Sequence, residues 1–268
     1  MAGIVMAFKE FRPDLGIWNS PWIGLENFEY MFLLQEVRRI LFNTLNISMG
    51  KIILNLLIPL IFALLLSEVH NLRFKRWTQT ITYMPHFLSW VILSGIILNI
   101  FSYNGPVNGM RESLGLKRFL FFAHAEIFPL FVILCDTWKE FGYSAVIYFA
   151  AITGIDPGLY EAAAIDGAGR LRRVFSVTLP CITTTVVLLA VLSLGNVLNA
   201  GFDQIFNLYN PLVYSTGDII DTWVYRAGLF NFQYSLATAV GLLKSLVSFI
   251  LIALSYLLAR RLANYRIF

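Results

Sequence analysis

Five long apolar segments are the feature of this sequence that most constrains its fold. Each is close to the ~20 residues that an α-helix needs to cross the hydrocarbon core of a bilayer. Only 13% of the residues are charged, against roughly 25% in a soluble domain. The segments are Leu41–Leu66, Thr78–Phe101, Phe128–Ala151, Thr183–Asn199 and Leu236–Leu258. The sequence therefore predicts an all-α, polytopic membrane protein with these five transmembrane helices.

The apolar segments divide the chain into three parts. Residues 1–40 precede the first span, and the part Phe8–Ile40 is polar and aromatic, with Trp18 and Trp22 as interfacial anchors. Residues 41–258 are predicted to form one transmembrane domain that includes a long polar loop at 152–182, and residues 259–268 form a short tail. Met1–Phe8 is apolar but too short to cross a bilayer. We expect it to be the outer end of a further, truncated first helix.

Several classes of site find no support in the sequence. The net charge of +4 is spread over the loops without a basic tract, which argues against a nucleic-acid partner. Cys135 and Cys181 lack the spacing of a redox or zinc motif, and His70, His86 and His124 lie near no cluster of ligand spacing. We therefore expect no metal site and no disulfide. The phosphate-binding pattern GxxxxGK[ST] is absent, so the chain is not expected to hydrolyse ATP by itself.

Basic residues in two loops suggest an orientation in the membrane. If residues 152–182 are cytoplasmic, parity places Ser67–Trp77 and the tail from Ala259 on the same side. These two segments carry Arg73, Lys75, Arg76, Arg260, Arg261 and Arg266, in agreement with the positive-inside rule. The segment Phe8–Ile40, which parity places outside, also carries basic residues, so the bias is weak: Lys9, Arg12, Arg38 and Arg39.

The segment Ile155–Pro180 is too polar to cross a bilayer, yet it carries the signals of two short helices. Asp156 is a residue type preferred at a helix N-cap, and Pro157 suits the first helical position. Gly167 predicts a stop followed by a sharp turn. A second short helix is expected over Arg170–Val177, before the next span begins. The sequence thus predicts a rigid helix–turn–helix protrusion.

An ordinary amphipathic surface loop would not require the residue order of this segment, which resembles the EAA loop of ABC importer permeases. The match consists of Glu161-Ala162-Ala163, Gly167 six residues after the glutamate, and Val177-Thr178-Leu179-Pro180, where the family usually has Ile-x-Leu-Pro. Residues 164–168 have the form common in carbohydrate importers of the maltose and oligosaccharide type. In that family the loop docks into a groove of the ATPase subunit. The resemblance implies these coupling residues: Asp156, Tyr160, Glu161, Ala162, Ala163, Asp166, Gly167, Arg170 and Pro180.

Four further stretches resemble the subgroup that imports complex saccharides: Asn43–Leu45, Tyr83–Val91, Gly201–Phe206 and Asp221–Arg226. The resemblance implies a type I ABC importer permease fold in the bacterial inner membrane, with a cytoplasmic C-terminus. It also implies four kinds of partner: two ATPase subunits that bind ATP and Mg, a second, homologous but non-identical permease, an external solute-binding protein, and the lipid bilayer. On this view the chain itself is non-catalytic and holds no cofactor.

Ionisable side chains interrupt three of the apolar segments. Asp136, Lys139 and Glu140 share one face of the third segment, so they can pair with one another. Charges at this depth either line a polar path or form ion pairs that hold helices together, and both interpretations remain open here. Lys51 in the first segment is more simply explained as structural. Lys244 interrupts the last segment.

Amide side chains suggest how a saccharide is bound. Asn196 and Asn199 are expected on one face of the fourth span, and amides bind sugar hydroxyl groups as well as neighbouring helices. The predicted substrate path comprises Asp136, Lys139, Glu140, Asn196, Asn199 and Lys244. For an acidic saccharide such as alginate, Lys139, Lys244 and Arg226 would offset the charge of the substrate.

Two other functional classes are weighed against an ABC permease. A secondary transporter often has internally repeated halves with matching helix breaks, and we find no such repeat. An intramembrane enzyme needs a nucleophile with a base, or a metal constellation. The sequence contains neither HExxH nor GxSxG, and Lys139 beside Asp136 and Glu140 favours ion pairing over acid–base catalysis.

Overall fold

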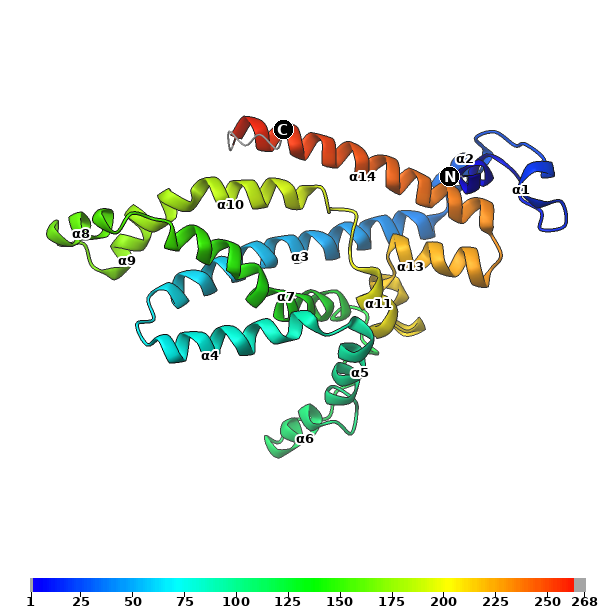
Figure 1. Ribbon diagram of the computed structural model, residues 1–268. Helices are drawn as coiled ribbons and strands as arrows, with labels where there is room; N and C mark the ends of the chain where they lie inside the picture. Colours follow the sequence, from blue (N-terminus) through cyan, green and yellow to red (C-terminus); the bar gives the residue numbers. More distant parts are fainter. Residues whose placement is uncertain (1, 263–268) are drawn as a thin grey trace. The chain divides into compact units, whose positions relative to one another are not determined.

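A computed structural model describes residues 2–262, and these residues form helices joined by turns and loops (Figure 1). The longer helices are α2 (Glu26–Leu33), α3 (Gln35–Ser67), α4 (Leu72–Tyr83), α5 (Trp90–Ile100), α6 (Pro106–Ser113), α7 (Phe128–Thr153), α8 (Pro157–Ile165), α10 (Leu179–Leu194) and α14 (Tyr234–Leu262). The shorter ones are η1 (Ala2–Phe8), α1 (Gly16–Asn19), η2 (Met84–Phe87), α9 (Arg170–Arg173), η3 (Val174–Thr178), α11 (Phe202–Leu208), η4 (Pro211–Val213), α12 (Tyr214–Gly217), α13 (Ile220–Tyr225) and η5 (Arg226–Phe230). Most of the predicted tail, residues 263–268, lies outside the described part of the chain.

The described helices confirm an all-α membrane fold. Among residues 2–262, three helical stretches are long and apolar enough to cross a bilayer: Gln35–Ser67, Arg170–Leu194 and Tyr234–Ala259. The broken pair Leu72–Phe87 and Trp90–Ile100 would make a fourth. α7 is 26 residues long but contains Asp136, Lys139 and Glu140, too many charges for a purely apolar span. The number of five spans therefore stays a prediction.

The second predicted segment is not one continuous helix. α4 ends at Tyr83 and is followed by the 3₁₀ turn Met84–Phe87. Pro85 has no amide hydrogen and cannot continue the regular hydrogen-bond series of the helix. Ser89 then caps a new helix, because its Oγ accepts a hydrogen bond of 3.3 Å from the backbone of Ile92. The prediction of an unbroken Thr78–Phe101 helix is wrong.

The fourth segment differs from its prediction at both ends. The short helix expected after the glycine turn runs on through a π-helical turn, Val174–Thr178, into α10, so Pro180 lies inside continuous helix. α10 ends at Leu194 with Gly195 as its C-cap. Asn196 and Asn199 consequently lie in the turn beyond the helix, where the backbone N–H of Asn199 bonds to the carbonyl of Asn196 at 2.8 Å. The prediction that they share a helix face is wrong.

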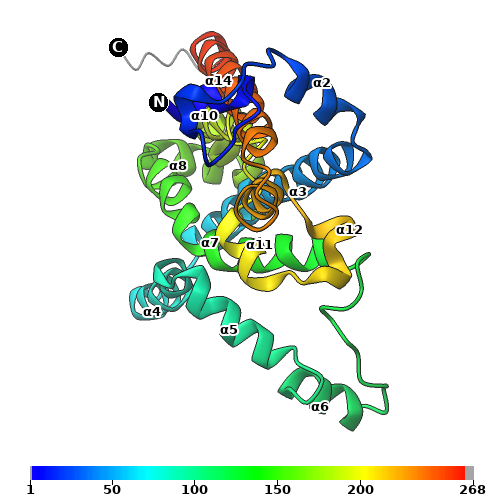
Figure 2. The same ribbon diagram turned by 90° about the vertical axis from the view of Figure 1, so that its right-hand side faces the viewer.

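The chain forms two compact units. Unit 1 comprises residues 1–49, 89–133 and 196–251, and unit 2 comprises residues 50–88, 134–195 and 252–268, so α3, α7 and α14 contribute to both. In unit 1, buried Met31, Val37, Ile40, Ile220 and Trp223 belong to one apolar core. Figure 2 shows α5 of this unit leading into α6, from which an extended loop returns to α7.

The core of unit 2 lies between α3, α7 and α10. It consists of buried Ala63, Ala145, Tyr148, Ile152 and Ile182. α7 also approaches α4 very closely at Gly142. A Cβ atom added there would lie 2.2 Å from the backbone oxygen of Thr82, so only glycine permits this contact. The tight packing fixes which face of α4 is turned toward α7.

Candidate functional site

The polar segment between α7 and α10 forms the predicted protrusion. Oδ1 of Asp156 accepts a hydrogen bond of 2.9 Å from the backbone of Gly158 and caps α8, with Pro157 at the first helical position. Gly167 has a φ of +74°, a left-handed conformation that favours glycine, and it turns the chain toward α9. The hydroxyl groups of Tyr160 and Thr178 lie 3.0 Å apart and link α8 to the π-helical turn. This contact joins the two arms of the protrusion.

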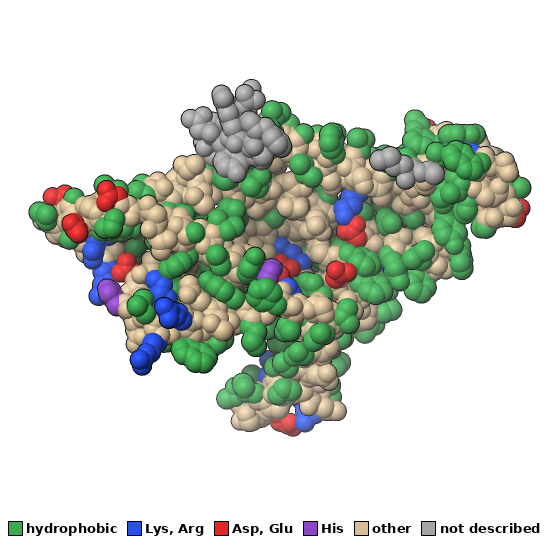
Figure 3. Space-filling model, in the orientation of Figure 1, with side chains coloured by type: hydrophobic (Ala, Val, Ile, Leu, Met, Phe, Trp, Pro, Cys, Tyr) green, Lys and Arg blue, Asp and Glu red, His purple; other side chains and the backbone are tan. Residues whose placement is uncertain are grey.

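The surface of this protrusion is exposed and chemically mixed. Glu161 and Ala162 are exposed on α8, and Ala163 is partly buried. Ile165 is 87% exposed, and Leu171 is also largely exposed. Charged side chains gather over α8, α9 and the start of α4, at the left of the space-filling view in Figure 3. Apolar side chains exposed among charges are typical of a surface that contacts another protein.

A group of charged side chains on α7 and its neighbours in unit 2, here called the α7 charge cluster, comprises Lys51, His86, Asp136, Lys139 and Glu140. Asp136 pairs with Lys51 of α3 at 3.1 Å and accepts a hydrogen bond of 2.9 Å from Asn55. Both of these contacts are made to α3, whereas the sequence had suggested pairing within α7. Lys51 and Asp136 are both largely buried, so this pair ties α3 to α7.

The remaining members of the α7 charge cluster connect α7 to η2. Nζ of Lys139 lies 2.8 Å from Oε1 of Glu140 and donates a hydrogen bond of 2.8 Å to the backbone oxygen of His86. Oε2 of Glu140 lies 2.6 Å from Nδ1 of His86. The ring of His86 also stacks on Tyr143, with the ring centroids 4.0 Å apart. A histidine that sequence reasoning left as an unassigned packed residue thus belongs to the cluster.

A cavity of about 340 Å³ lies beside this cluster in unit 2. Its wall combines apolar, aromatic and hydroxyl side chains: Asn55, Leu56, Tyr143, Ser144, Val146, Ile147, Tyr148, Leu189 and Ser193. Oδ1 of Asn55 and the hydroxyl group of Tyr148 are buried and lack a hydrogen-bond partner in the described structure. An apolar hollow with a few polar groups in its wall is the usual form of a small-molecule site.

Sequence reasoning missed most of the cavity wall, although a signal was present. Asn55 follows Lys51 by one helical turn, and Tyr143 follows Glu140 by three residues, so each lies on the helix face that carries the charges. Ser193 lies on α10, where it forms a hydrogen bond of 2.8 Å to the backbone oxygen of Leu189. Helical spacing from the charged residues would therefore have found two of the polar positions but not Ser193.

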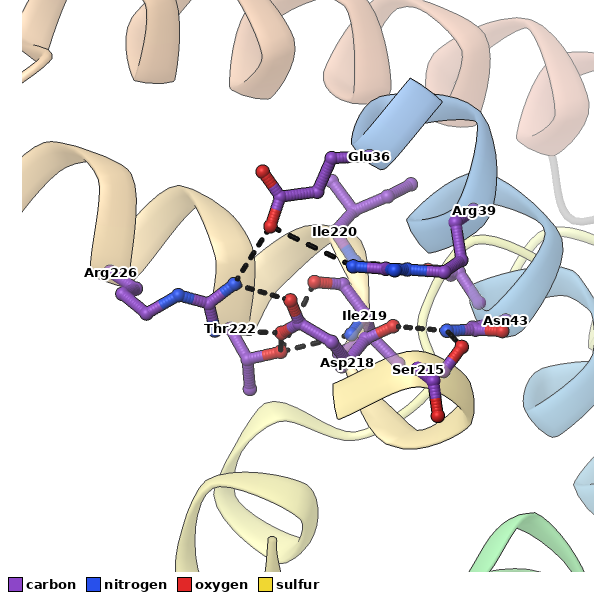
Figure 4. Close-up of polar contacts among 10 residues, drawn as sticks. Glu36, Arg39, Asn43, Ser215, Asp218, Ile219, Ile220, Thr222 and Arg226 are labelled. Atoms are coloured by element: carbon purple, nitrogen blue, oxygen red, sulfur yellow. Dashed lines mark hydrogen bonds and ion pairs between the residues drawn. The ribbon is translucent and has the colours of Figure 1, made fainter. Parts of the chain in front are cut away.

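Unit 1 contains a second polar group, the Asp218 network of Glu36, Asp218, Thr222 and Arg226 (Figure 4). The carboxylate of Asp218 is 0% exposed and receives Arg226 Nη2 at 2.5 Å and Thr222 Oγ1 at 2.7 Å. Glu36 of α3 lies 3.6 Å from Arg226. Burial acts to lower the pKa of Arg226, but its hydrogen bond to Asp218 and the charge of Asp218 outweigh burial and raise it.

The backbone around Asp218 is also fixed to α3. Nδ2 of Asn43 donates hydrogen bonds to the backbone oxygens of Ser215 and Asp218, at 3.2 and 3.0 Å (Figure 4). Oγ1 of Thr44 accepts a hydrogen bond of 3.0 Å from the backbone of Ile220. The Asn43-Thr44 pair singled out in the sequence therefore holds α12 and α13 against α3.

The three cations that were expected to offset the charge of an acidic substrate have carboxylate partners within this chain. Lys139 lies 2.8 Å from Glu140, Lys244 lies 2.5 Å from Asp221, and Arg226 lies 2.5 Å from Asp218. Each of the three is thus already paired with a carboxylate. Lys139 is in unit 2 beside the cavity, whereas Lys244 and Arg226 belong to unit 1 with Asn196 and Asn199. The six residues of the predicted substrate path do not come from one cluster.

Comparison with known proteins adds a family and close relatives. The family described as "Binding-protein-dependent transport system inner membrane component" matches residues 55–264. Protein LplB of Bacillus subtilis (strain 168) is 40% identical over 253 residues, which covers 94% of this chain and 80% of that protein. The polygalacturonan/rhamnogalacturonan transport system permease protein YteP of the same organism is 39% identical, with 100% and 84% covered.

Two solved structures are similar over almost the whole chain. The first is described as a bacterial ABC transporter involved in the import of the acidic polysaccharide alginate. The similarity has a TM-score of 0.89 at 37% identity and covers 97% of this chain and 88% of that one. The second is a bacterial alginate ABC transporter in complex with an alginate pentasaccharide-bound periplasmic protein, with a TM-score of 0.89 at 35% identity and coverage of 99% and 88%.

Proposed function

Because this chain belongs to the family of binding-protein-dependent transport system inner membrane components, we propose that it translocates a saccharide as one permease of an ATP-driven importer. The chain is a multi-pass inner-membrane permease subunit that works with a solute-binding protein. Such a subunit is non-catalytic, and ATP and Mg are bound by partner ATPase subunits. The similarity to YteP and to the alginate transporter, at 39% and 37% identity, carries the saccharide assignment.

The topology that fits this role has five spans, with α4 and α5 together as the second and α7 as the third. The charges of α7 support it, because an ionisable side chain within a span is stable when it is paired and turned away from lipid. In this arrangement residues 152–182 and the C-terminus are cytoplasmic, which places the basic start of α4 on the same side. The expected partner permease is homologous and non-identical.

The protrusion of α8 and α9 couples transport to ATP hydrolysis. Its exposed Glu161, the small Ala162 and Ala163 beside it, and the turn at Gly167 suit a helix that inserts into a groove of an ATPase subunit. The Tyr160–Thr178 contact supports rigid transmission, because it ties α8 to the π-helical turn that continues into α10. Asp156, Asp166, Arg170 and Pro180 complete the proposed coupling segment.

An acidic oligosaccharide is the substrate that the relatives favour, since polygalacturonan and alginate are both polymers of uronic acids. The cavity in unit 2 supports a sugar subsite: Asn55, Tyr143 and Ser193 offer an amide, an aromatic ring and hydroxyl groups. Asp136, Lys139 and Glu140 lie beside it, and Lys139 is the proposed cation for a uronate. Asn196, Asn199 and Lys244 remain proposed contacts further along the path.

The test is uptake by the complex that copurifies with this chain, reconstituted in liposomes with its binding protein. We expect uptake to require ATP inside the liposomes and to continue without an ion gradient; gradient-driven uptake would instead indicate a secondary transporter. Uronate oligomers should be imported and should stimulate ATP hydrolysis. Lys139→Gln should reduce uptake of a uronate oligomer far more than uptake of a neutral one, and equal effects would refute the acidic substrate.

Glu161→Lys tests the coupling role. It should abolish substrate-stimulated ATP hydrolysis because it reverses the charge of the docking helix, while the purified chain keeps its helical content. Glu68→Lys is the matched control, because Glu68 is another exposed glutamate of unit 2 outside the protrusion. Normal stimulation in Glu161→Lys, or equal loss in both variants, would contradict the assignment.

A further inference from the structure

The start of α4 carries a basic and apolar face that the transport function does not use. Residues 69–111 contain no aspartate or glutamate, whereas Arg73, Lys75 and Arg76 follow one another closely at the helix start. Oδ1 of Asn71 accepts hydrogen bonds of 3.0 and 3.1 Å from the backbones of Arg73 and Phe74. This cap fixes where the helix begins and thereby fixes the directions of the side chains that follow.

The exposed side of α4 has two adjoining stripes. Phe74, Trp77 and Ile81 recur at helical spacing and are 59%, 69% and 64% exposed. Arg73 and Arg76, three residues apart, form an exposed basic stripe next to them. The opposite side of the helix is occupied, since Thr82 meets Gly142 of α7 and Lys75 lies over the ring of Phe149, 4.4 Å from its centroid.

We propose that this face of α4 binds anionic phospholipid headgroups at the membrane surface. Guanidinium groups form paired hydrogen bonds with phosphate oxygens, and two of them one turn apart can hold one headgroup or two neighbouring ones. Phe74, Trp77 and Ile81 then enter the boundary between headgroups and acyl chains, where tryptophan is enriched. The inference rests on the proposed placement of residues 67–77 at the cytoplasmic surface, whose leaflet is rich in anionic lipid.

The chemistry of the face favours lipid over a protein partner. No carboxylate in this stretch would repel a phosphate or pair with the arginines in its place. The apolar stripe is continued in η2 by exposed Met84 and Phe87, so apolar surface extends away from the basic end. A cationic end followed by an apolar face matches the order of headgroup and acyl chain along the membrane normal.

Native mass spectrometry of the full chain, purified with its partner subunits, tests the proposal with phosphatidylglycerol and phosphatidylcholine added in equal amounts. The wild-type chain should retain phosphatidylglycerol preferentially. Arg73→Gln with Arg76→Gln should lower that preference roughly thirtyfold, because each basic residue near an anionic surface adds to binding. Arg73→Lys with Arg76→Lys should keep part of the preference, because lysine retains the charge but not the paired hydrogen bonds of a guanidinium group.

The matched control is Arg38→Gln with Arg39→Gln, which removes the same charge from two adjacent exposed arginines on α3. It should leave the preference unchanged. Equal loss in both glutamine variants, no loss in the α4 variant, or displacement of the lipid by inorganic phosphate would overturn the proposal. Loss of a copurifying subunit in the α4 variant with lipid retention unchanged would identify a protein interface instead. Lipid retention is measured without transport, so its failure is distinct from failure of the importer assignment.

Discussion

The Asp218 network of unit 1 and the α7 charge cluster of unit 2 differ in how completely their polar atoms are satisfied. Asp218 is 0% exposed, and its two carboxylate oxygens receive Arg226 and Thr222 from the same stretch of chain. In the α7 charge cluster, Glu140 is 27% exposed, and the adjoining Asn55 keeps a buried oxygen without a partner. The carboxylate of Asp218 is thus fully hydrogen-bonded and stabilises the fold, whereas the α7 charge cluster adjoins a cavity and a polar atom without a hydrogen-bond partner. In the proposed function, the first group holds the fold and the second lies next to the bound substrate.

The largest expected loss of stability comes from removing Asp218 from its network. Asp218→Ala leaves the guanidinium of Arg226 partly buried beside an empty position, and removal of one partner from a buried ion pair costs roughly 3–5 kcal/mol. The purified chain should lose most of its thermal stability, measured by circular dichroism of its helices as the temperature rises. Glu36→Gln is the control: Glu36 is half exposed and 3.6 Å from Arg226, so its removal should cost less than about 1 kcal/mol. A small loss of stability in Asp218→Ala would show that the Asp218 network does not hold the fold together.

The features that could be predicted from the sequence are those that depend on residues close together in the chain. The cap at Asp156 and the turn at Gly167 depend on neighbouring residues only, and both were predicted correctly. The partner of Asp136 was not, because Lys51 lies on another helix, and the periodicity of one helix does not tell which helix packs against it. Pro85 and Gly195 did signal the break after α4 and the end of α10, but the surrounding apolar residues suggested continuous spans.

A smaller effect is expected in the pair that anchors the α7 charge cluster. Lys51→Gln or Asp136→Asn alone should destabilise the chain by about 2 kcal/mol, because the amide that replaces one charge keeps part of the hydrogen bonding to its largely buried partner. The double variant should recover part of that loss, because no isolated charge remains. The coupling energy from this double-mutant cycle, measured by thermal unfolding, should be about 1 kcal/mol or more. Additive losses would show that the two side chains do not stabilise each other.

The smallest effect should appear in transport alone. Ser193→Ala removes one hydroxyl group from the cavity wall, and a single lost hydrogen bond is worth about 1 kcal/mol, or roughly a fivefold rise in the half-saturating substrate concentration. The unfolding temperature should change little, because the hydrogen bond of Ser193 in the described part of the chain is made to the backbone oxygen of Leu189 in its own helix. Ser245→Ala is the matched control: Ser245 makes the same kind of bond, 2.9 Å to Gly241, but does not line the cavity. Uptake must be measured with the assembled transporter and its binding protein, at saturating ATP, so that binding and translocation of the substrate limit the rate. If Ser245→Ala changed uptake as much as Ser193→Ala, the effect would come from helix stability and not from the cavity. The proposed difference between the Asp218 network and the α7 charge cluster would then be unsupported.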